Sequence, residues 1–170
     1  MNKLLQTDRL YITEFTETMA HSVHINSLDE ANRRFLPDEV FKTEAGALEA
    51  IKFLISCYGS AQGPFVYPVL LKDGTHIGHV EAVPVEKGYE LGYHIAAAFT
   101  GKGYAAEAVT AFVPYIMDKL KIDRINGICH YDNLASRRVL EKCGFKLIFD
   151  GMGLYQGRER HICRYEISQN

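Results

Sequence analysis

Two closely spaced glycines, Gly101 and Gly103, are the residues of this chain whose spacing points most directly to chemistry. They follow residues 89–95, which are predicted to form a strand, and they precede residues 105–120, which are predicted to form a helix. Glycine lets the backbone approach a ligand closely, and the free N–H groups at the start of a helix attract an anion. The junction is therefore a candidate phosphate-binding loop.

Three kinds of phosphate site use such a junction. A P-loop is excluded because Lys102 is followed by glycine rather than by serine or threonine. The dinucleotide fingerprint G-x-G-x-x-[GA] is matched by Gly101, Gly103 and Ala106, but that fingerprint belongs to a first βαβ unit with parallel strands. A dinucleotide site therefore stays a remote alternative. The third kind binds the pyrophosphate of coenzyme A, and the residues downstream of the loop favour it.

The elements that position this loop alternate between short strands and helices. Short turns at 72–74 and 86–88 join three successive strands, which must therefore run antiparallel. We predict one domain over residues 1–170, of the α/β class (α+β type), with a mixed, mostly antiparallel sheet and helices on both faces. The expected strands are 9–15, 66–71, 76–83, 89–95, 124–130, 145–149 and 160–167. The expected helices are 16–28, 43–58 with Thr43 as its cap, 105–120 with a kink or break at Pro114, and 133–143 with Asp132 or Asn133 as its cap and Gly144 as its stop. Loops are expected at 151–153 and 156–157.

The composition excludes several classes of protein. A formal net charge of -2 supplies no basic surface for nucleic acid or for an anionic membrane. No apolar run approaches the ~20 residues of a membrane span, and the first residues are too short and polar for a signal peptide. The four cysteines are widely spaced, which favours reduced core residues in a cytoplasmic protein.

Metal ligation is not expected from the histidines. His21 and His24 have helical spacing, but no nearby cysteine completes a ligand set. His76 and His79 would face opposite sides of a regular strand. We therefore predict no metal site.

Four motifs occur in order along the chain: Thr7-Asp-Arg9-Leu10, Glu90-Leu-Gly-Tyr93, Gly101-Lys-Gly-Tyr-Ala-Ala-Glu-Ala108, and Asn133 to Phe145 with the pattern N-x-x-S-x-x-V-L-E-K-x-G-F. Together they resemble the GCN5-related N-acetyltransferase (GNAT) superfamily, and within it the RimJ/RimL-type ribosomal-protein acetyltransferases. The resemblance covers nearly the whole chain. It implies an enzyme that transfers an acetyl group from acetyl-CoA to a primary amine by direct attack in a ternary complex.

The chain departs from the family pattern at three positions. Thr100 stands where the superfamily usually has glutamine or arginine, and His94 stands where the closer group often has tryptophan. Leu140 occupies the position of the tyrosine that commonly protonates the leaving thiolate. These departures keep open the alternative of a non-catalytic acyl-CoA-binding or sensing module.

The resemblance also implies roles for individual residues. The backbone of the loop would hold the pyrophosphate, the backbone around Ile95 would pair with the pantetheine arm, and Asn133 would bind the same arm. Ser136 is the expected partner of the thiolate. The full set expected to bind the co-substrate is His94, Ile95, Ala96, Thr100, Gly101, Lys102, Gly103, Tyr104, Ala105, Asn133 and Ser136.

The base and the acceptor are less constrained by the sequence. Glu90 is the preferred base and Glu81 the second choice, because both lie on central strands that could face an acceptor cleft. Glu107 is expected to complement the start of the long helix, while Tyr131 and Tyr155 could line the cleft. The acceptor is either a protein N-terminus or a small amine, and a homodimer is left open. The acids Asp29, Glu30, Asp38 and Glu39 could attract a cationic acceptor or form an ordinary solvated face.

Overall fold

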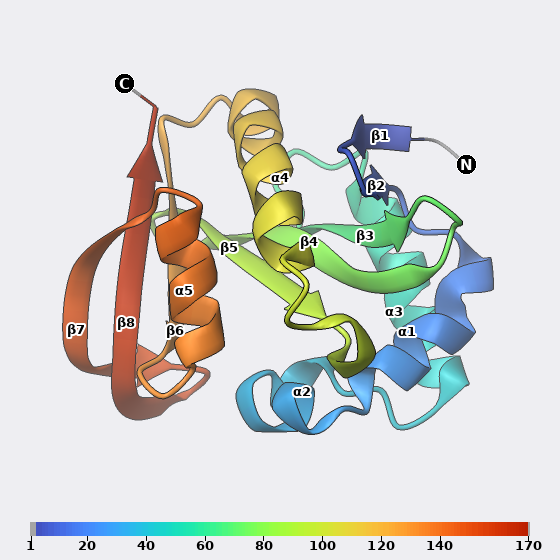
Figure 1. Cartoon of the computed structure of the whole chain (residues 1–170), viewed down its shortest axis with the longest axis horizontal. Helices are drawn as coiled ribbons and strands as arrows, with labels where there is room; N and C mark the ends of the chain where they lie inside the picture. The colour runs from blue at the N-terminus through green and yellow to red at the C-terminus, as the bar shows by residue number, and fades with distance from the viewer. Residues whose placement is uncertain (1–2, 170) are drawn as a thin grey trace.

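The computed structural model describes residues 3–169, which form one eight-stranded sheet with helices on both faces (Figure 1). The sheet order is β1-β2-β3-β4-β5-β6-β8-β7, and every neighbouring pair is antiparallel except β5 and β6, which are parallel. The strands are β1 (Lys3–Gln6), β2 (Leu10–Thr13), β3 (Phe65–Leu71), β4 (His76–Val85), β5 (Gly88–Ile95), β6 (Arg124–His130), β7 (Lys146–Tyr155) and β8 (Arg158–Ser168). This confirms the predicted α/β class with a mostly antiparallel sheet.

The helices divide between the two faces of the sheet (Figure 1). Helices α4 and α5 cover the front face in that view, and α1 and α3 lie behind it. The helices are α1 (Ala20–Ser27), α2 (Glu30–Phe35), α3 (Glu44–Cys57), α4 (Tyr104–Leu120) and α5 (Leu134–Lys142). Short 3-10 turns occupy Glu17–Met19, Pro37–Glu39 and Ala97–Phe99.

The two faces have cores of very different size. On the α4 face, strand residues such as Phe65 and Tyr67 pack against Phe112 and Ile116 of the helix in one large buried cluster. On the α3 face, the buried cluster contains only Phe15, Ala20, Ile51 and Val66. The α3 face is therefore less completely filled, and a cavity lies there.

Strands β5 and β6 part along their length. They are paired only at Glu90 with Asn126 and at Leu91 with Gly127. Beyond these pairs β5 continues to Ile95 with its other edge bonded to β4. The last residues of β5 therefore have no strand partner on the side that faces β6, and the sheet is open at its centre.

Several predicted boundaries need correction. Strand β1 and helix α2 were not expected from the sequence, and both are short. Residues 151–153 lie inside β7 rather than in a loop. Glycine is needed at position 153 for close packing, because a side chain there would collide with Ile162 of the paired strand. Helix α4 runs unbroken through Pro114, whose ring is exposed, so the carbonyl left without a donor can face water.

Other local predictions are confirmed. Thr43 caps α3 by accepting a hydrogen bond from the Gly46 N–H, and Asn133 caps α5 in the same way from Ser136. Gly144 follows α5 with a positive φ of 87°. All four cysteines are free thiols. In the part of the chain described, no helix combines the length and apolar character needed to cross a membrane.

Candidate active site

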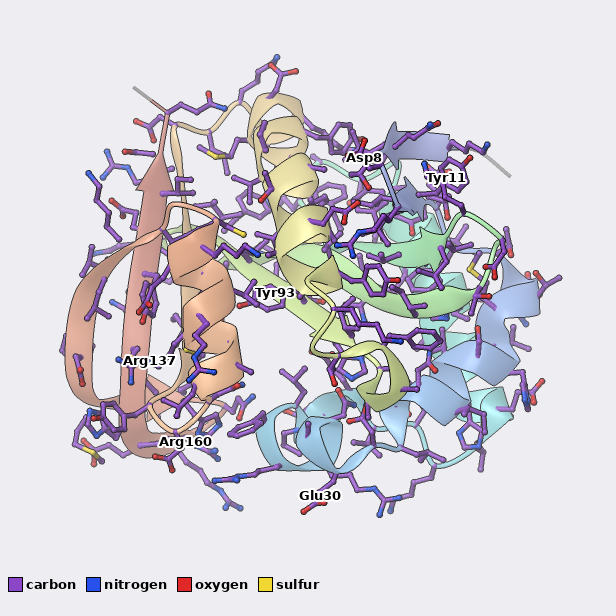
Figure 2. The ribbon with its side chains drawn as sticks, in the orientation of Figure 1. Asp8, Tyr11, Glu30, Tyr93, Arg137 and Arg160 are labelled. Carbon is purple, nitrogen blue, oxygen red and sulfur yellow. The ribbon has the colours of Figure 1, made fainter. Side chains whose placement is uncertain are left out.

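A cleft of about 710 Å³ lies where β5 and β6 part, between the start of α4 and the face of α5. It extends from the glycine junction at residues 100–105, past Tyr93 and Ser136, to Glu81 and Glu90. Figure 2 shows Tyr93 between the ribbons of α4 and α5. The cleft therefore joins the predicted phosphate loop to the predicted catalytic residues in one continuous space.

The glycine junction has the conformation that its sequence predicts. Gly101 and Gly103 have φ angles of 75° and 81°, a region that disfavours other residues, and Gly103 is the N-cap of α4. Among the described residues, no acceptor is found for the backbone N–H groups of residues 102–106. Several free donors at a helix start are suited to an anion such as a pyrophosphate.

The loop is held from the other end of the chain. Arg9 donates from Nε to Glu107 at 2.6 Å and from Nη1 to the Lys102 carbonyl at 2.9 Å, and its guanidinium lies 4.6 Å from the centre of the Tyr104 ring. Thr7 donates to the other Glu107 oxygen at 2.6 Å. Burial acts to raise the pKa of Glu107, but these hydrogen bonds outweigh it and leave the pKa lowered. Glu107 thus fastens the first strands to α4.

Most of the residues expected to bind a co-substrate line the cleft. Two do not: the Ala96 N–H donates to the Ile77 carbonyl, and Lys102, whose ammonium lies 5.7 Å from the centre of the Phe99 ring, is outside the lining. The expected residues that line the cleft are His94, Ile95, Thr100, Gly101, Gly103, Tyr104, Ala105, Asn133 and Ser136.

Tyr93 and Ser136 form a hydroxyl pair across the cleft. Tyr93 Oη lies 2.8 Å from Ser136 Oγ and donates to the Ser136 carbonyl at 2.9 Å. Because the Tyr93 proton is donated to the Ser136 carbonyl, the Tyr93 oxygen accepts a hydrogen bond from the Ser136 hydroxyl. Burial is the main cause that raises the pKa of Tyr93, so the phenol stays protonated at neutral pH. Tyr93 was quoted from the sequence only as the end of the motif 90–93 and was given no role. It lies on the same face of β5 as Leu91, two residues before it, and packs against the core.

Cys129 also lines this part of the cleft. Burial is the main cause that raises the pKa of its thiol to about 11. At neutral pH only about one molecule in 10⁴ would hold the thiolate, which is the nucleophilic form. Cys129 is therefore a poor candidate for a covalent acyl carrier.

Two carboxylic acids lie at the other end of the cleft with strongly raised pKa values. Burial is the main cause that raises the pKa of Glu81 to about 7, with a further contribution from the charge of Glu39. Burial likewise raises the pKa of Glu90 to about 7, and the nearby charge of Arg164 opposes it. A carboxylate with this pKa is suited to take a proton near neutral pH.

The Glu81 side chain depends on a glycine directly across the strand pair. Glu81 on β4 is paired with Gly92 on β5, and a Cβ atom at Gly92 would overlap the Glu81 carboxylate. The missing side chain thus creates the space in which the carboxylate lies. Glu81 lines both the cleft and the cavity on the α3 face, whereas Glu90 lines the cleft alone.

The orientation predicted for two histidines is wrong. An extra residue in β4 shifts the register between Val69 and Leu70 of β3, so that Leu70 faces His76 and Val69 faces Gly78. The extra residue offsets the usual alternation of side chains, so residues three positions apart lie on the same side of β4 here. His76 and His79 therefore both line the cavity on the α3 face. Burial is the main cause that lowers the pKa of His76 to about 4, so this ring is neutral.

His79 and Glu39 form an ion pair, with 3.3 Å between His79 Nε2 and Glu39 Oε2. Burial disfavours the charge on each of them, but their mutual attraction outweighs it: the pKa of Glu39 is lowered and that of His79 is raised. His94 pairs with Asp29 at 3.1 Å. Its pKa is nevertheless lowered, first by burial and then by the charge of His79.

The four acids considered from the sequence have different surroundings in the structure. Glu30 and Asp38 are exposed, and Figure 2 shows Glu30 on the outer side of α2. Asp29 and Glu39 instead point inward to His94 and His79. Asp38 and Glu39 line both the cleft and the cavity on the α3 face, Asp29 holds His94 from outside their lining, and Glu30 belongs to the solvated surface.

The remaining candidates have clear positions. Tyr155 lines the cleft and donates to the Ile128 carbonyl, whereas Tyr131 stacks on His161 outside the cleft lining. Leu140 is buried, lines the cleft and lies so close to Gly127 that a Cβ atom there would overlap it. Glu39, His79 and Glu81 place three potential ligand atoms within 4.8 Å of one another, close enough to hold a metal ion in principle.

A family model for the GNAT acetyltransferase domain matches residues 9–146, which is most of the chain. The chain belongs to the GNAT acetyltransferase family. It is similar to the uncharacterized N-acetyltransferase YnaD of Bacillus subtilis, with 30% identity over 145 residues that cover 84% of this chain and 82% of that protein. The chain is thus an N-acetyltransferase by family, and the cleft lies where its sequence motifs meet.

Solved structures agree on the fold of this acetyltransferase. A GNAT-family acetyltransferase from Bacillus anthracis superposes with a TM-score of 0.82 at 24% identity, covering 96% of this chain and 97% of that one. The ribosomal-protein acetyltransferase RimL in complex with coenzyme A gives a TM-score of 0.84 at 18% identity and covers 98% of both chains. At these identities the likeness describes the fold alone, so residue roles rest on the geometry above.

Proposed function

We propose that this GNAT acetyltransferase transfers the acetyl group of acetyl-CoA to a primary amine by direct attack in a ternary complex. The observation that carries the proposal is the single cleft that connects the free N–H groups of residues 102–106 to the Tyr93–Ser136 pair and on to Glu81. One elongated ligand with a phosphate at one end and a reactive group at the other fits this arrangement. A RimL relative has been solved with coenzyme A bound, which supports the choice of ligand.

The charges along the cleft change sign in the way this ligand requires. Arg138 and Lys142 line the cleft from α5, whose end contacts the start of α4 through Cys143 and the Ala106 carbonyl. The basic residues therefore lie toward the phosphate loop. The carboxylates of Glu39, Glu81 and Glu90 line the opposite end, where an amine would approach. An anion and a cation are thus attracted to opposite ends of the same cleft.

The chain supplies the groups that acetyl transfer needs. Acetyl-CoA supplies the thioester carbon and, after the C–S bond breaks, the thiolate. Glu81 accepts the proton that the attacking amine loses, either directly or through a water molecule. As the sulfur departs, the Tyr93 phenol turns its proton from the Ser136 carbonyl to the sulfur, while the Ser136 hydroxyl keeps donating to the Tyr93 oxygen. The position of Glu81 in both cavities favours it over Glu90 as the base, which reverses the order chosen from the sequence.

Binding calorimetry tests the co-substrate. We expect coenzyme A to bind and a nicotinamide dinucleotide to show no binding heat under the same conditions. A thiol-release assay with acetyl-CoA and a panel of primary amines then tests catalysis. Tight dinucleotide binding without coenzyme A binding would refute the proposal. Coenzyme A binding without thiol release from any amine would favour the alternative of an acyl-CoA-binding or sensing module.

The Arg9–Glu107 contact gives a second test of the phosphate loop. We expect Glu107→Ala to weaken coenzyme A binding about three- to tenfold, because Arg9 would no longer hold the Lys102 carbonyl and the loop would lose order. Turnover at saturating acetyl-CoA should stay within about twofold, since Glu107 does not line the cleft.

The matched control for this change is Asp118→Ala on the same helix. Asp118 is exposed and pairs only with Lys121, one turn away. Asp118→Ala removes one carboxylate from α4 without changing a contact of the loop. The calorimetric Kd of this variant for coenzyme A should therefore equal that of the wild type. Equal Kd values for both variants would show that the contact does not order the loop.

A further inference from the structure

The cavity on the α3 face has a volume of about 400 Å³, at the lower end of the range for small-molecule sites. It lies between α1, α3 and the sheet, where the buried core is small. It shares six lining residues with the cleft, so the two spaces meet at the acidic end; they are Asn32, Asp38, Glu39, Glu81, Val83 and His94. A molecule in this cavity can therefore present one group to the reacting end of the cleft.

Most of the cavity wall away from this junction is apolar, and the polar exceptions are Asn26, Ser27 and His76. Aromatic and aliphatic side chains come from both helices, from the sheet and from the segment before α3. Lysine and arginine are absent from the lining among residues 3–169. The apolar lining residues are Phe15, Val23, Phe41, Ala50, Ile51, Phe53, Leu54, Pro64, Val66 and Val83. This lining favours a neutral apolar group and opposes a second charge.

At the junction, two buried acceptor oxygens lack donors within the described chain. Asn32 is 2% exposed, and its Oδ1 has no hydrogen-bond partner, although its Nδ2 donates to the carbonyls of Ser27 and Glu39. Glu39 Oε2 faces His79 at 3.3 Å but likewise accepts no hydrogen bond. Unpaired buried acceptors are costly, so a ligand that brings N–H donors is favoured here. A primary ammonium brings three.

We propose that this cavity selects the acceptor: a primary amine with a neutral aromatic or branched aliphatic side group. The side group fills the cavity on the α3 face, and the amino group lies at the junction against Asn32, Glu39 and Glu81. The inference rests on the proposed acetyl transfer and names its substrate class. Polyamines are disfavoured because a second charge would enter the apolar part. Acidic acceptors are disfavoured because they would face Glu39 and Glu81.

The test compares acceptors in the thiol-release assay with saturating acetyl-CoA. We expect kcat/KM to be at least about tenfold higher for phenethylamine and phenylalaninamide than for spermidine, glycinamide or aspartic acid amide. A peptide that begins with phenylalanine distinguishes a small-molecule acceptor from a protein N-terminus. It is acetylated only if the site also admits the peptide chain that follows the first residue. Preference for spermidine or for glycinamide would overturn the proposal while leaving acetyl transfer intact.

Cavity variants separate this pocket from the general reaction. We expect Ala50→Phe, which projects a ring into the cavity from α3, to raise KM for phenethylamine at least about tenfold. KM for glycinamide and the Kd of coenzyme A should not change. The control Glu49→Phe places the same ring on the exposed side of α3, where the Glu49 side chain is 78% exposed, and should match the wild type. Equal phenethylamine KM values for Ala50→Phe and Glu49→Phe would refute the pocket.

Two further measurements keep the proposal testable. Phe53→Ala removes a ring from the lining and enlarges the cavity. The ratio of kcat/KM values should shift from phenethylamine toward a naphthyl amine, an outcome that does not depend on the folding of Ala50→Phe. Turnover should be unaffected by a chelator. Loss of activity with chelator and recovery with Zn²⁺ would assign Glu39, His79 and Glu81 to a metal ion and overturn the assignment to an amine.

Discussion

Glu81→Gln is expected to lower kcat about 10²–10³-fold, the usual contribution of a positioned general base. Glutamine keeps the size of the side chain but cannot take a proton from the attacking amine. For the wild type, kcat/KM should rise with pH and level off above about 7, because Glu81 has a pKa of about 7 and must be deprotonated to act. In Glu81→Gln the rise due to this group should disappear.

The matched control is Glu90→Gln, since Glu90 has the same raised pKa but lines the cleft alone. It should keep the pH-dependent limb and lose much less turnover. If Glu90→Gln shows the larger loss and the altered pH profile, the roles of the two acids are the reverse of those proposed. If both variants keep wild-type turnover, neither carboxylate is the base.

Gly92→Ala tests the same carboxylate without changing any charge. The added methyl group would occupy the space of the Glu81 side chain and force it to move. Gly92 has no positive φ angle, so alanine itself fits the backbone. We expect a lower kcat with an unchanged Kd for coenzyme A. An unchanged kcat would mean that the position of the Glu81 carboxylate is not critical.

The same raised pKa predicts an effect on stability. A carboxyl group with a pKa near 4.5 in the unfolded chain and about 7 in the folded one binds its proton more tightly in the folded state. Stability is therefore lost as pH rises between these values. Glu81→Gln should be more stable than the wild type at pH 8, by roughly 1–3 kcal/mol, and should gain nothing at pH 4. Thermal unfolding at the two pH values measures this difference.

Ser136→Ala and Tyr93→Phe are expected to lower kcat about 10- to 100-fold each, with little change in the Kd of coenzyme A. Each removes one hydroxyl of the pair that would donate to the leaving sulfur. Because the two hydroxyls are hydrogen-bonded to each other, the kcat of the double variant should fall by far less than the product of the two single-variant factors. Steady-state kinetics on the two single variants and the double variant completes the cycle.

Tyr89→Phe is the control for the loss of a tyrosine hydroxyl on the same strand. Its hydroxyl donates to the Gln62 carbonyl, and the residue does not line the cleft. Its kcat should match the wild type. Additive losses for Ser136 and Tyr93 would show that they act separately, and no loss for either would exclude both from stabilising the thiolate.

Local elements and the phosphate loop could be predicted from the sequence because their signals are local. The caps Thr43 and Asn133, the glycines at 101 and 103 and the alternating central strands depend on neighbouring residues, and the structure agrees with them. Residues 151–153 were misread because glycine also serves close strand packing, as at Gly153 against Ile162. The helix does not break at Pro114, because an exposed position tolerates the lost hydrogen bond.

The sequence by itself determined the fold class, the family resemblance and the loop proposed to bind a phosphate, since these depend on residue types at short, fixed spacings. Only the tertiary structure joined residues distant in the chain: Arg9 to Glu107, Tyr93 to Ser136, and Glu39 to His79. It also turned His76 and His79 to one side through a bulge. Strand register, burial and pKa arise from packing across the sheet, which no local spacing encodes.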